Sequence, residues 1–239
     1  MGKRLRVQRL GRGGPTFRAK KKGKLDVEYP SYLQMRDSVL NGQVVALLKE
    51  PARSVVVAKV LLEDDSACYI LAPEGLQVGQ MIKFGKDADL NIGNVLPLRS
   101  IPEGCAIFNI ELTPGDGGKL VRSTGSYALL VGKDSENAII KLPSGKTKSL
   151  PLDCRATIGC ASGGERTEKP FVKAGKKYYY MKAKGRKHVK VRGVAMNASD
   201  HPFGGEQHHP GKSKSVKRGA PPGRKVGHVA SRRTGRRKK

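Results

Sequence analysis

Short runs of apolar, often β-branched residues recur through the middle of the chain, and turn-forming residues separate them. The first set of runs is Val44–Leu48, Ser54–Leu62, Cys68–Leu71 and Gln80–Phe84. Pro51, the polar stretch Glu63–Ser66 and the stretch from Pro73 to Gly75 lie between them. Runs this short, interrupted this often, predict the strands of a meander rather than helices. Glu63–Ser66 is predicted to be a hairpin turn.

A second set of runs follows residues 95–104, which contain Pro97 and Pro102 and are predicted to be a linker. The runs are Ala106–Leu112, Lys119–Arg122, Tyr127–Val131, Asn137–Leu142, Thr147–Leu150 and Arg155–Ile158. Clear turn sequences separate several of them, such as Pro114–Gly118 and Pro143–Gly145. Strands at this spacing favour small closed barrels of about 60–70 residues each. The centre of the chain is therefore predicted to be all-β, with two barrels rather than one sandwich.

The two ends of the chain have a different composition. Residues 161–239 show little apolar periodicity and contain Gly-Gly and Pro-Pro steps that break long elements. The predicted organisation has four parts: a basic extension at 1–24, a first barrel at 25–88, a second barrel at 89–160 and a basic extension at 161–239.

Charge is distributed unevenly along these parts. The formal net charge is +27, from 47 Lys and Arg against 20 Asp and Glu. Residues 1–24 hold ten cations and no acid, residues 25–160 hold 14 cations and 16 acids, and residues 161–239 hold 23 cations and four acids. A charge of this size favours a polyanionic partner. Charge blocks of this kind act as interaction segments, and we expect both extensions to be disordered in the free protein.

Glycine and aromatic residues narrow the choice of polyanion. Glycine stands beside cations at 173–187 and 221–225, where a backbone without Cβ can approach a sugar–phosphate chain closely. Trp is absent and aromatic residues make up 5% of the chain, so recognition of folded RNA by shape and phosphate fits better than a stacking platform. Tyr178–Tyr180 is either a stacking site or a short strand with one inward Tyr. No recognition helix is evident, but a histone-like mode of DNA binding remains open.

Several other classes of protein are disfavoured. The longest largely apolar run, Val55–Leu62, contains Lys59 and is far shorter than the roughly 20 residues that span a bilayer, so no membrane partner and no export signal are expected. The four cysteines form no CxxC pair, which is typical of reduced, mostly buried thiols in a cytosolic protein. Cys154 and Cys160 lie far from the histidines in sequence, so neither a metal nor another cofactor is predicted.

Asp200 and His201 raise the possibility of an enzyme. Asp200 could orient His201 as a base, with Ser199 or Ser213 as the nucleophile. Adjacent residues rarely face one another in that way, and no GxSxG turn is present. We expect instead that His201 forms a hydrogen bond with RNA or with the backbone in a tight turn, and that the chain is not an enzyme.

Several motifs are specific to one family. Gly193–Gly205, with the sequence GVAMNASDHPFGG, resembles the signature loop of the universal large-subunit ribosomal protein family two. Further similar segments lie along nearly the whole chain, at Gly11–Gly14, Asn109–Gly118, Lys141–Gly145, Cys154–Gly159 and Lys169–Gly175. The short N-terminal arm and the ending Pro221–Gly235 are more similar to archaeal and eukaryotic members. Phe203 stands where many members carry His.

The resemblance implies an oligonucleotide-binding (OB) barrel, then a Src-homology-three-type barrel, then a long RNA-penetrating extension. It also implies binding of large-subunit rRNA near the peptidyl-transferase region and a contribution to subunit association. The loop from Asn197 to Gly205 would lie closest to that region, with His201 positioning RNA. The implied partners are large-subunit rRNA, neighbouring ribosomal proteins and the small subunit, with the chain present as a monomer within cytoplasmic ribosomes.

The candidate rRNA-contacting residues combine the cations of both extensions with motif positions. They are Arg4, Arg6, Arg9, Arg12, Arg18, Lys20, Lys21, Arg155, Lys169, Lys173, Lys176, Lys177, Tyr178, Lys182, Lys184, Arg186, Lys187, Arg192, Asn197, Asp200, His201, Lys212, Lys214, Arg224, Lys225, Arg232 and Arg233.

Overall fold

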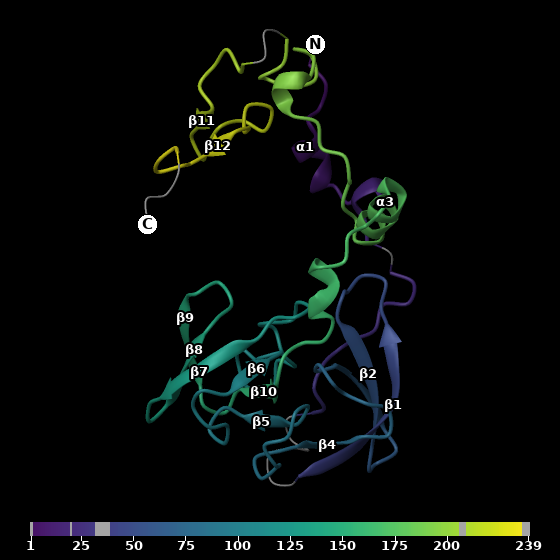
Figure 1. The fold of residues 1–239 in the computed structure, drawn as a ribbon. Coiled ribbons are helices and arrows are strands. Elements are labelled where there is room, and N and C mark those ends of the chain that lie inside the picture. The colour runs from purple at the N-terminus through teal and green to yellow at the C-terminus, as the bar shows by residue number, and fades with distance from the viewer. Residues whose placement is uncertain (1, 20, 32–38, 206–208, 236–239) are drawn as a thin grey trace. The chain divides into compact units, whose positions relative to one another are not determined.

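The computed structural model describes residues 2–19, 21–31, 39–205 and 209–235 (Figure 1). The chain divides into two compact units. Residues 20–171 form one, which we call the β unit. Residues 1–19 and 172–239 together form the other, which we call the terminal unit. The two ends of the chain therefore belong to one unit, whereas the sequence suggested two separate extensions.

The β unit contains a ten-stranded sheet with the order β3-β2-β1-β4-β5-β10-β6-β7-β8-β9. Its strands are β1 (Leu40–Lys49), β2 (Val56–Leu62), β3 (Ala67–Leu71), β4 (Met81–Phe84), β5 (Val95–Pro97), β6 (Ala106–Phe108), β7 (Ala128–Lys133), β8 (Asn137–Lys141), β9 (Thr147–Pro151) and β10 (Arg155–Ile158). All pairings are antiparallel except that of β4 with β5, which join through Phe84 and Val95. The all-β fold class is confirmed.

In the first half of the β unit, β1 pairs with both β2 and β4. A bulge between Val44 and Ala46 shifts its register and bends the strand. Gly42 leaves room for the side chain of Val60 on β2, because a Cβ at position 42 would lie 2.5 Å from Cγ1 of Val60. The apolar faces of these strands enclose a core that includes Ile82 and Phe84, both fully buried.

The second half has a separate core. Residues from β5, β6, β7, β8 and β10, among them Leu96, Ile107, Leu130 and Ile140, are fully buried in it. A third cluster, which contains Val57, Leu71 and Phe108, includes side chains from both halves. Figure 1 shows β1, β2 and β4 grouped apart from β6–β9 within the β unit. The two cores are linked by one continuous sheet within a single compact unit, and the division into two barrels stays a prediction.

The predicted hairpin at 63–66 connects β2 to β3, where the Ser66 carbonyl accepts the Leu62 N–H at 2.9 Å. Two other expectations for this region were wrong. Residues 95–104 are not only a linker, because β5 begins there and pairs with β10. Residues 119–122 form no strand; Leu120 makes an isolated bridge to Ile110, and Val121 has a φ of 53°, which ends extended structure.

A buried ion pair fastens the N-terminal edge of the β unit to β10. The Arg155 guanidinium donates to Oε1 of Glu111 from Nη2 at 2.6 Å and from Nε at 3.0 Å, and Nη1 donates to the Pro30 carbonyl at 2.8 Å. Tyr29 lies beneath the guanidinium, and its hydroxyl donates to the Asn109 carbonyl at 2.6 Å. Burial raises the pKa of Tyr29, so its hydroxyl stays protonated.

The C-terminal end of the β unit extends further than expected. Ala161 forms a bridge with Pro73, and the Ser162 N–H donates to the Ala72 carbonyl at 3.1 Å. A 3₁₀ turn, η2 (Gly164–Thr167), follows, and Nε of Arg166 donates to the Thr124 hydroxyl at 3.2 Å. These contacts explain why the unit extends to residue 171 rather than ending near residue 160.

The cysteines all belong to the β unit and are free thiols. Cys154 is buried, whereas Cys68, Cys105 and Cys160 are half-buried, so the expectation of mostly buried thiols was only partly right. Burial raises the pKa of Cys154 to about 12 and that of Cys68 to about 11. Both are protonated and unreactive at neutral pH.

The terminal unit contains little regular structure. Its elements are α1 (Arg6–Leu10), η1 (Pro15–Phe17), α3 (Ala174–Ala183), η3 (Gly193–Ala195), β11 (Ser215–Val216) and β12 (His228–Val229). Strands β11 and β12 pair in parallel. The core consists of Leu5, Phe203 and Val226, with Val194 packed against them, so residues from both ends of the chain meet in it.

None of the helices in the described ranges has the length and apolar character needed to cross a membrane.

Candidate nucleic-acid interface

The terminal unit carries nearly all of the excess positive charge. Its described residues include 23 Lys and Arg and a single acid, Asp200. The described residues of the β unit include 18 Lys and Arg and 17 Asp and Glu. Asp200, the one acid among the described residues of the terminal unit, forms an ion pair, with Lys3 Nζ 3.1 Å from its Oδ1. A surface of this composition is suited to a polyanion.

Helix α3 presents cations and aromatic rings on an exposed surface. No residue of the helix is buried, and Tyr179 is 69% exposed. Lys184 Nζ lies 4.3 Å from the centre of the Tyr180 ring, and Lys182 Nζ lies 5.9 Å from that of Tyr178. Both pairs are four residues apart, the spacing that brings side chains together on a helix. Tyr178–Tyr180 is thus helical, and the alternative of a short strand with one inward Tyr was wrong.

The end of α3 is fixed by a glycine. The Gly185 N–H donates to the Lys182 carbonyl at 3.1 Å and the Arg186 N–H to the Met181 carbonyl at 2.8 Å, a Schellman motif. Gly185 has a φ of 66°. A Cβ there would lie 2.7 Å from the Phe17 carbonyl oxygen, so the N-terminal segment passes directly over the helix end. The cations of α3 and those of residues 2–19 are held together in this way.

The loop at 193–205 folds tightly on itself. The carbonyl of Asn197 accepts the N–H groups of Asp200 at 3.0 Å and His201 at 3.2 Å. Gly204 packs so closely against Met196 and Asn197 that a Cβ would clash with their carbonyl oxygens. The N-terminal segment joins the loop, since the Lys3 N–H donates to the Ser199 carbonyl at 2.7 Å. The loop is therefore tightly folded and is joined to the cationic N-terminal segment.

His201 is part of this tightly folded loop. Its Nδ1 accepts the Phe203 N–H at 3.1 Å, and its ring lies 5.2 Å from the Phe203 ring and directly against Gly193. Burial lowers the pKa of His201, so the imidazole is neutral at pH 7 with its proton on Nε2. Asp200 instead pairs with Lys3, so the arrangement of an acid orienting a histidine base does not form. Nε2–H remains as a hydrogen-bond donor.

The structure corrects one candidate residue. Arg155 is 3% exposed and its guanidinium is engaged by Glu111 and Pro30, so it holds the β unit together and is not available to a phosphate. Its role was missed because the partner lies 44 residues earlier in the sequence. Lys20 lies outside the described residues.

The other candidates fall into two groups by exposure. The half-buried ones are Arg6, Lys184, Asp200, His201, Arg224 and Lys225. The exposed ones are Arg4, Arg9, Arg12, Arg18, Lys21, Lys169, Lys173, Lys176, Lys177, Tyr178, Lys182, Arg186, Lys187, Arg192, Asn197, Lys212, Lys214, Arg232 and Arg233. Lys21 and Lys169 belong to the β unit, and the rest belong to the terminal unit.

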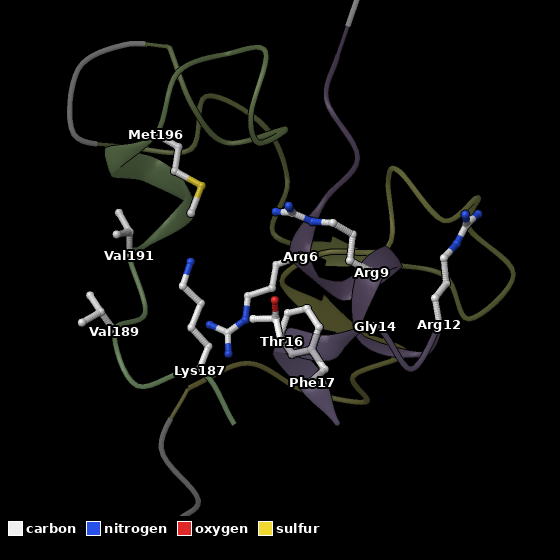
Figure 2. Close-up of a pocket in the computed structure, with 10 residues that line it drawn as sticks. All are labelled: Arg6, Arg9, Arg12, Gly14, Thr16, Phe17, Lys187, Val189, Val191 and Met196. Atoms are coloured by element: carbon white, nitrogen blue, oxygen red, sulfur yellow. The ribbon is translucent and has the colours of Figure 1, made fainter. Parts of the chain in front are cut away.

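Sequence reasoning missed a pocket in the terminal unit. Residues 6–17 and residues 187–196 line a cavity of about 500 Å³ (Figure 2). Phe17, Val189, Val191 and Met196 contribute apolar surface to it, and none of them was a candidate. Their spacing in the sequence gives no signal, because tertiary packing alone brings the two segments together.

No three His, Cys, Asp or Glu side chains gather as a metal site would require anywhere in the part of the chain that the structure describes.

A charge-balanced all-β unit joined to a strongly cationic unit with exposed tyrosines is typical of a nucleic-acid-binding protein. Comparison with known families specifies it further. Residues 6–83 match the model described as Ribosomal Proteins L2, RNA binding N-terminal domain, and residues 91–225 match Ribosomal Proteins L2, C-terminal domain. The chain belongs to the ribosomal protein L2 family.

Similar proteins come from archaea. The protein named large ribosomal subunit protein uL2 of Methanopyrus kandleri is 55% identical over 240 residues, covering 99% of this chain and 98% of its own. The protein of the same name from Methanothermobacter thermautotrophicus is 52% identical over 241 residues, covering 100% of both chains. That of Halorubrum lacusprofundi is 52% identical over 241 residues, covering 99% of this chain and 98% of its own. This family is one of structural ribosomal proteins, so the chain is not an enzyme.

Proposed function

We propose that this protein is a structural constituent of the large ribosomal subunit that binds large-subunit rRNA, chiefly through the terminal unit. The observation that carries the proposal is the segregation of charge: 23 cations and one acid in the described terminal unit, against near balance in the described β unit. Relatives of the same length bear the name of a large-subunit protein, and the model that matches residues 6–83 is described as RNA-binding.

The proposed contacts are mainly to phosphates. Lys and Arg side chains that neutralise phosphates release bound counterions, so the affinity falls steeply with salt. The exposed tyrosines of α3 add surfaces on which a base or ribose can pack. The shape of folded RNA, rather than its base sequence, would then decide where the terminal unit binds.

The experiment compares two charge-matched variants of the full chain binding to large-subunit rRNA over a roughly fourfold range of salt. Lys176→Gln with Lys177→Gln removes two exposed cations of α3, and Lys146→Gln with Lys148→Gln removes two exposed cations of the β unit. We expect the α3 pair to reduce the slope of log affinity against log salt by about two, and the β-unit pair to leave it unchanged. A flat salt response of the unaltered protein would refute the proposal.

Competition with duplex DNA tests the chromatin alternative. We expect folded rRNA to displace the protein from duplex DNA at equal phosphate concentration. Equal affinity for both would favour a general DNA-compacting protein instead.

Finer assignments follow from the same proposal. The loop Asn197–Gly205 would be the part nearest the peptidyl-transferase region, with the Nε2–H of His201 donating to RNA. Neighbouring ribosomal proteins and the small subunit would be the protein and interface partners, and the cytoplasm the site of action. Crosslinking of the protein in assembled subunits, followed by mapping of the attached residues, tests these assignments together.

A further inference from the structure

The cavity between residues 6–17 and 187–196 combines two kinds of wall (Figure 2). One kind is cationic, with Arg6, Arg9, Arg12 and Lys187 lining it. No acid lines the cavity, and the one described acid of the terminal unit is paired with Lys3. Because four like charges are placed around one space without compensation, the cavity is suited to an anion.

Arg6 gives a more specific indication. Its Nε is shielded from solvent and has no hydrogen-bond partner within the described residues. A buried N–H donor without a partner costs on the order of 1–3 kcal/mol, so a shift of the side chain that brings this donor to an acceptor in the adjoining cavity is favoured. Figure 2 shows the Arg6 side chain lying toward Lys187, between the two segments that form the cavity.

The other wall is apolar. Phe17 and Met196 are half-buried, whereas Val189 and Val191 are 64% and 56% exposed. Apolar side chains exposed together at a binding cavity indicate that the ligand covers them. A phosphate chain alone cannot do so, because it is polar throughout. A nucleotide matches both walls. The flat face of its base can pack on an aromatic ring, and its phosphate can pair with arginine.

We propose that this cavity holds one nucleotide of the large-subunit rRNA, turned out of its helical stack, with its base against Phe17 and its phosphate at Arg6 and Lys187. The inference rests on the proposed function and makes it more specific. The volume of about 500 Å³ is within the roughly 300–1,000 Å³ typical of small-ligand sites. Turning a base out of its stack costs a few kcal/mol, which stacking on an aromatic side chain offsets.

The first experiment measures the binding of the full chain to large-subunit rRNA for two variants of equal charge. Arg6→Gln alters the cavity, and Arg232→Gln removes an exposed cation of the terminal unit that does not line it. Both should reduce the salt slope by about one. We expect Arg6→Gln to weaken binding about tenfold beyond Arg232→Gln. Equal losses would overturn the inference.

The second experiment changes the cavity without changing charge. Phe17→Leu removes the ring, and Val191→Phe fills part of the space from a lining position that is 56% exposed. Each should weaken binding about five- to tenfold with an unchanged salt slope. Chemical probing of the bound rRNA should show one nucleotide protected by the unaltered protein and reactive with both variants. Protection that persists in both variants would overturn the inference.

The outcomes separate the two proposals. If the unaltered protein does not bind large-subunit rRNA, the proposed function fails. If it binds but the cavity variants behave as their controls do, only the nucleotide site fails. If the cavity variants keep full rRNA affinity but lose a neighbouring protein from reconstituted subunits, the occupant is an acidic peptide and the inference is wrong.

Discussion

The β unit and the terminal unit are each stabilised internally, but by different kinds of interaction. The β unit has a continuous ten-stranded sheet, three apolar clusters and a buried ion pair. Among its described residues, the terminal unit has three buried apolar side chains, a pair of two-residue strands and glycines that allow backbone segments to touch. Within one chain, most of the buried apolar side chains therefore lie in the β unit, and most of the excess positive charge lies in the terminal unit.

The difference has a physical reason. Uncompensated cations repel one another, and a small core gives little free energy to oppose that repulsion. The terminal unit therefore depends on its ligand: RNA that neutralises its cations also stabilises its fold. The sequence predicts that the extensions at 1–24 and 161–239 are disordered in the free protein. For the parts of them that form the terminal unit, residues 2–19 and 172–235, we expect faster protease cleavage than in the β unit and protection by rRNA. Equal resistance of both units without RNA would contradict it.

The largest expected effect is a loss of stability of the β unit when its buried ion pair is removed. Glu111→Ala leaves the Arg155 guanidinium buried without its counter-charge, which should cost about 3–5 kcal/mol of the free energy of unfolding. Denaturant unfolding followed by circular dichroism measures it. Asp153→Ala removes an exposed partner of Arg99 and is the control, with an expected change below about 1 kcal/mol. A small change for Glu111→Ala would show that the pair does not stabilise the unit.

The next largest effect is a loss of stability confined to the terminal unit. Phe203→Ala removes the largest side chain of its three-residue core and should destabilise it by about 3 kcal/mol. Limited proteolysis should then cut within residues 2–19 and 172–235 faster, while the β unit resists as before. Val229→Ala, at a half-exposed position outside that core, provides the comparison. Faster cleavage of the β unit in Phe203→Ala would mean that the units are not independent.

A smaller effect tests how the two ends of the chain are joined. Gly185→Ala forces a Cβ against the Phe17 carbonyl at a φ of 66°, which should cost about 1–2 kcal/mol. Hydrogen exchange in residues 15–19 should accelerate. Gly175→Ala, where a Cβ meets nothing within 4 Å, should leave exchange unchanged or slower. Equal exchange rates in the two variants would contradict a role for the contact between Gly185 and Phe17 in joining the two ends of the chain.

The smallest effect is a dependence on pH confined to the terminal unit. Burial lowers the pKa of His201 below its unfolded value of about 6.5, so the unfolded chain takes up the proton first and stability falls as pH drops below about 6.5. Protonation also converts Nδ1 from an acceptor of the Phe203 N–H into a donor. Protease sensitivity of the terminal unit should rise between pH 7.5 and 5.5. In His201→Gln the rise should disappear, and its persistence would assign the effect to another group.

Much of the β unit could be predicted from sequence because its signals are local. The breakers at Pro51 and 63–66 separate the strands where the structure does. Strand β5 escaped prediction because its pairing with β10 joins residues about 60 apart and Pro97 suggested a linker. Arg155 was misassigned for the same reason, since a cation in a family motif gives no indication that it is buried beside Glu111.

The terminal unit was less predictable. Its charge and signature loop are evident in the sequence, but the packing of Phe17 against Gly185 joins positions more than 160 residues apart. Tyr178–Tyr180 favours a strand by propensity, whereas the lysines, Ala174 and Ala183 around it favour the helix that forms. The cavity is likewise formed only by tertiary packing.

Because the terminal unit draws on residues 2–19 and 172–235, synthesis separates its two halves in time. Residues 2–19 emerge with six cations and no acid, and they have no Phe203 or Val226 to pack against until the whole β unit and residues 172–226 have been made. The β unit, a single continuous stretch, can mature in the interval. During that interval the six cations of residues 2–19 are open to any polyanion nearby, because the residues that complete their fold have not yet been made.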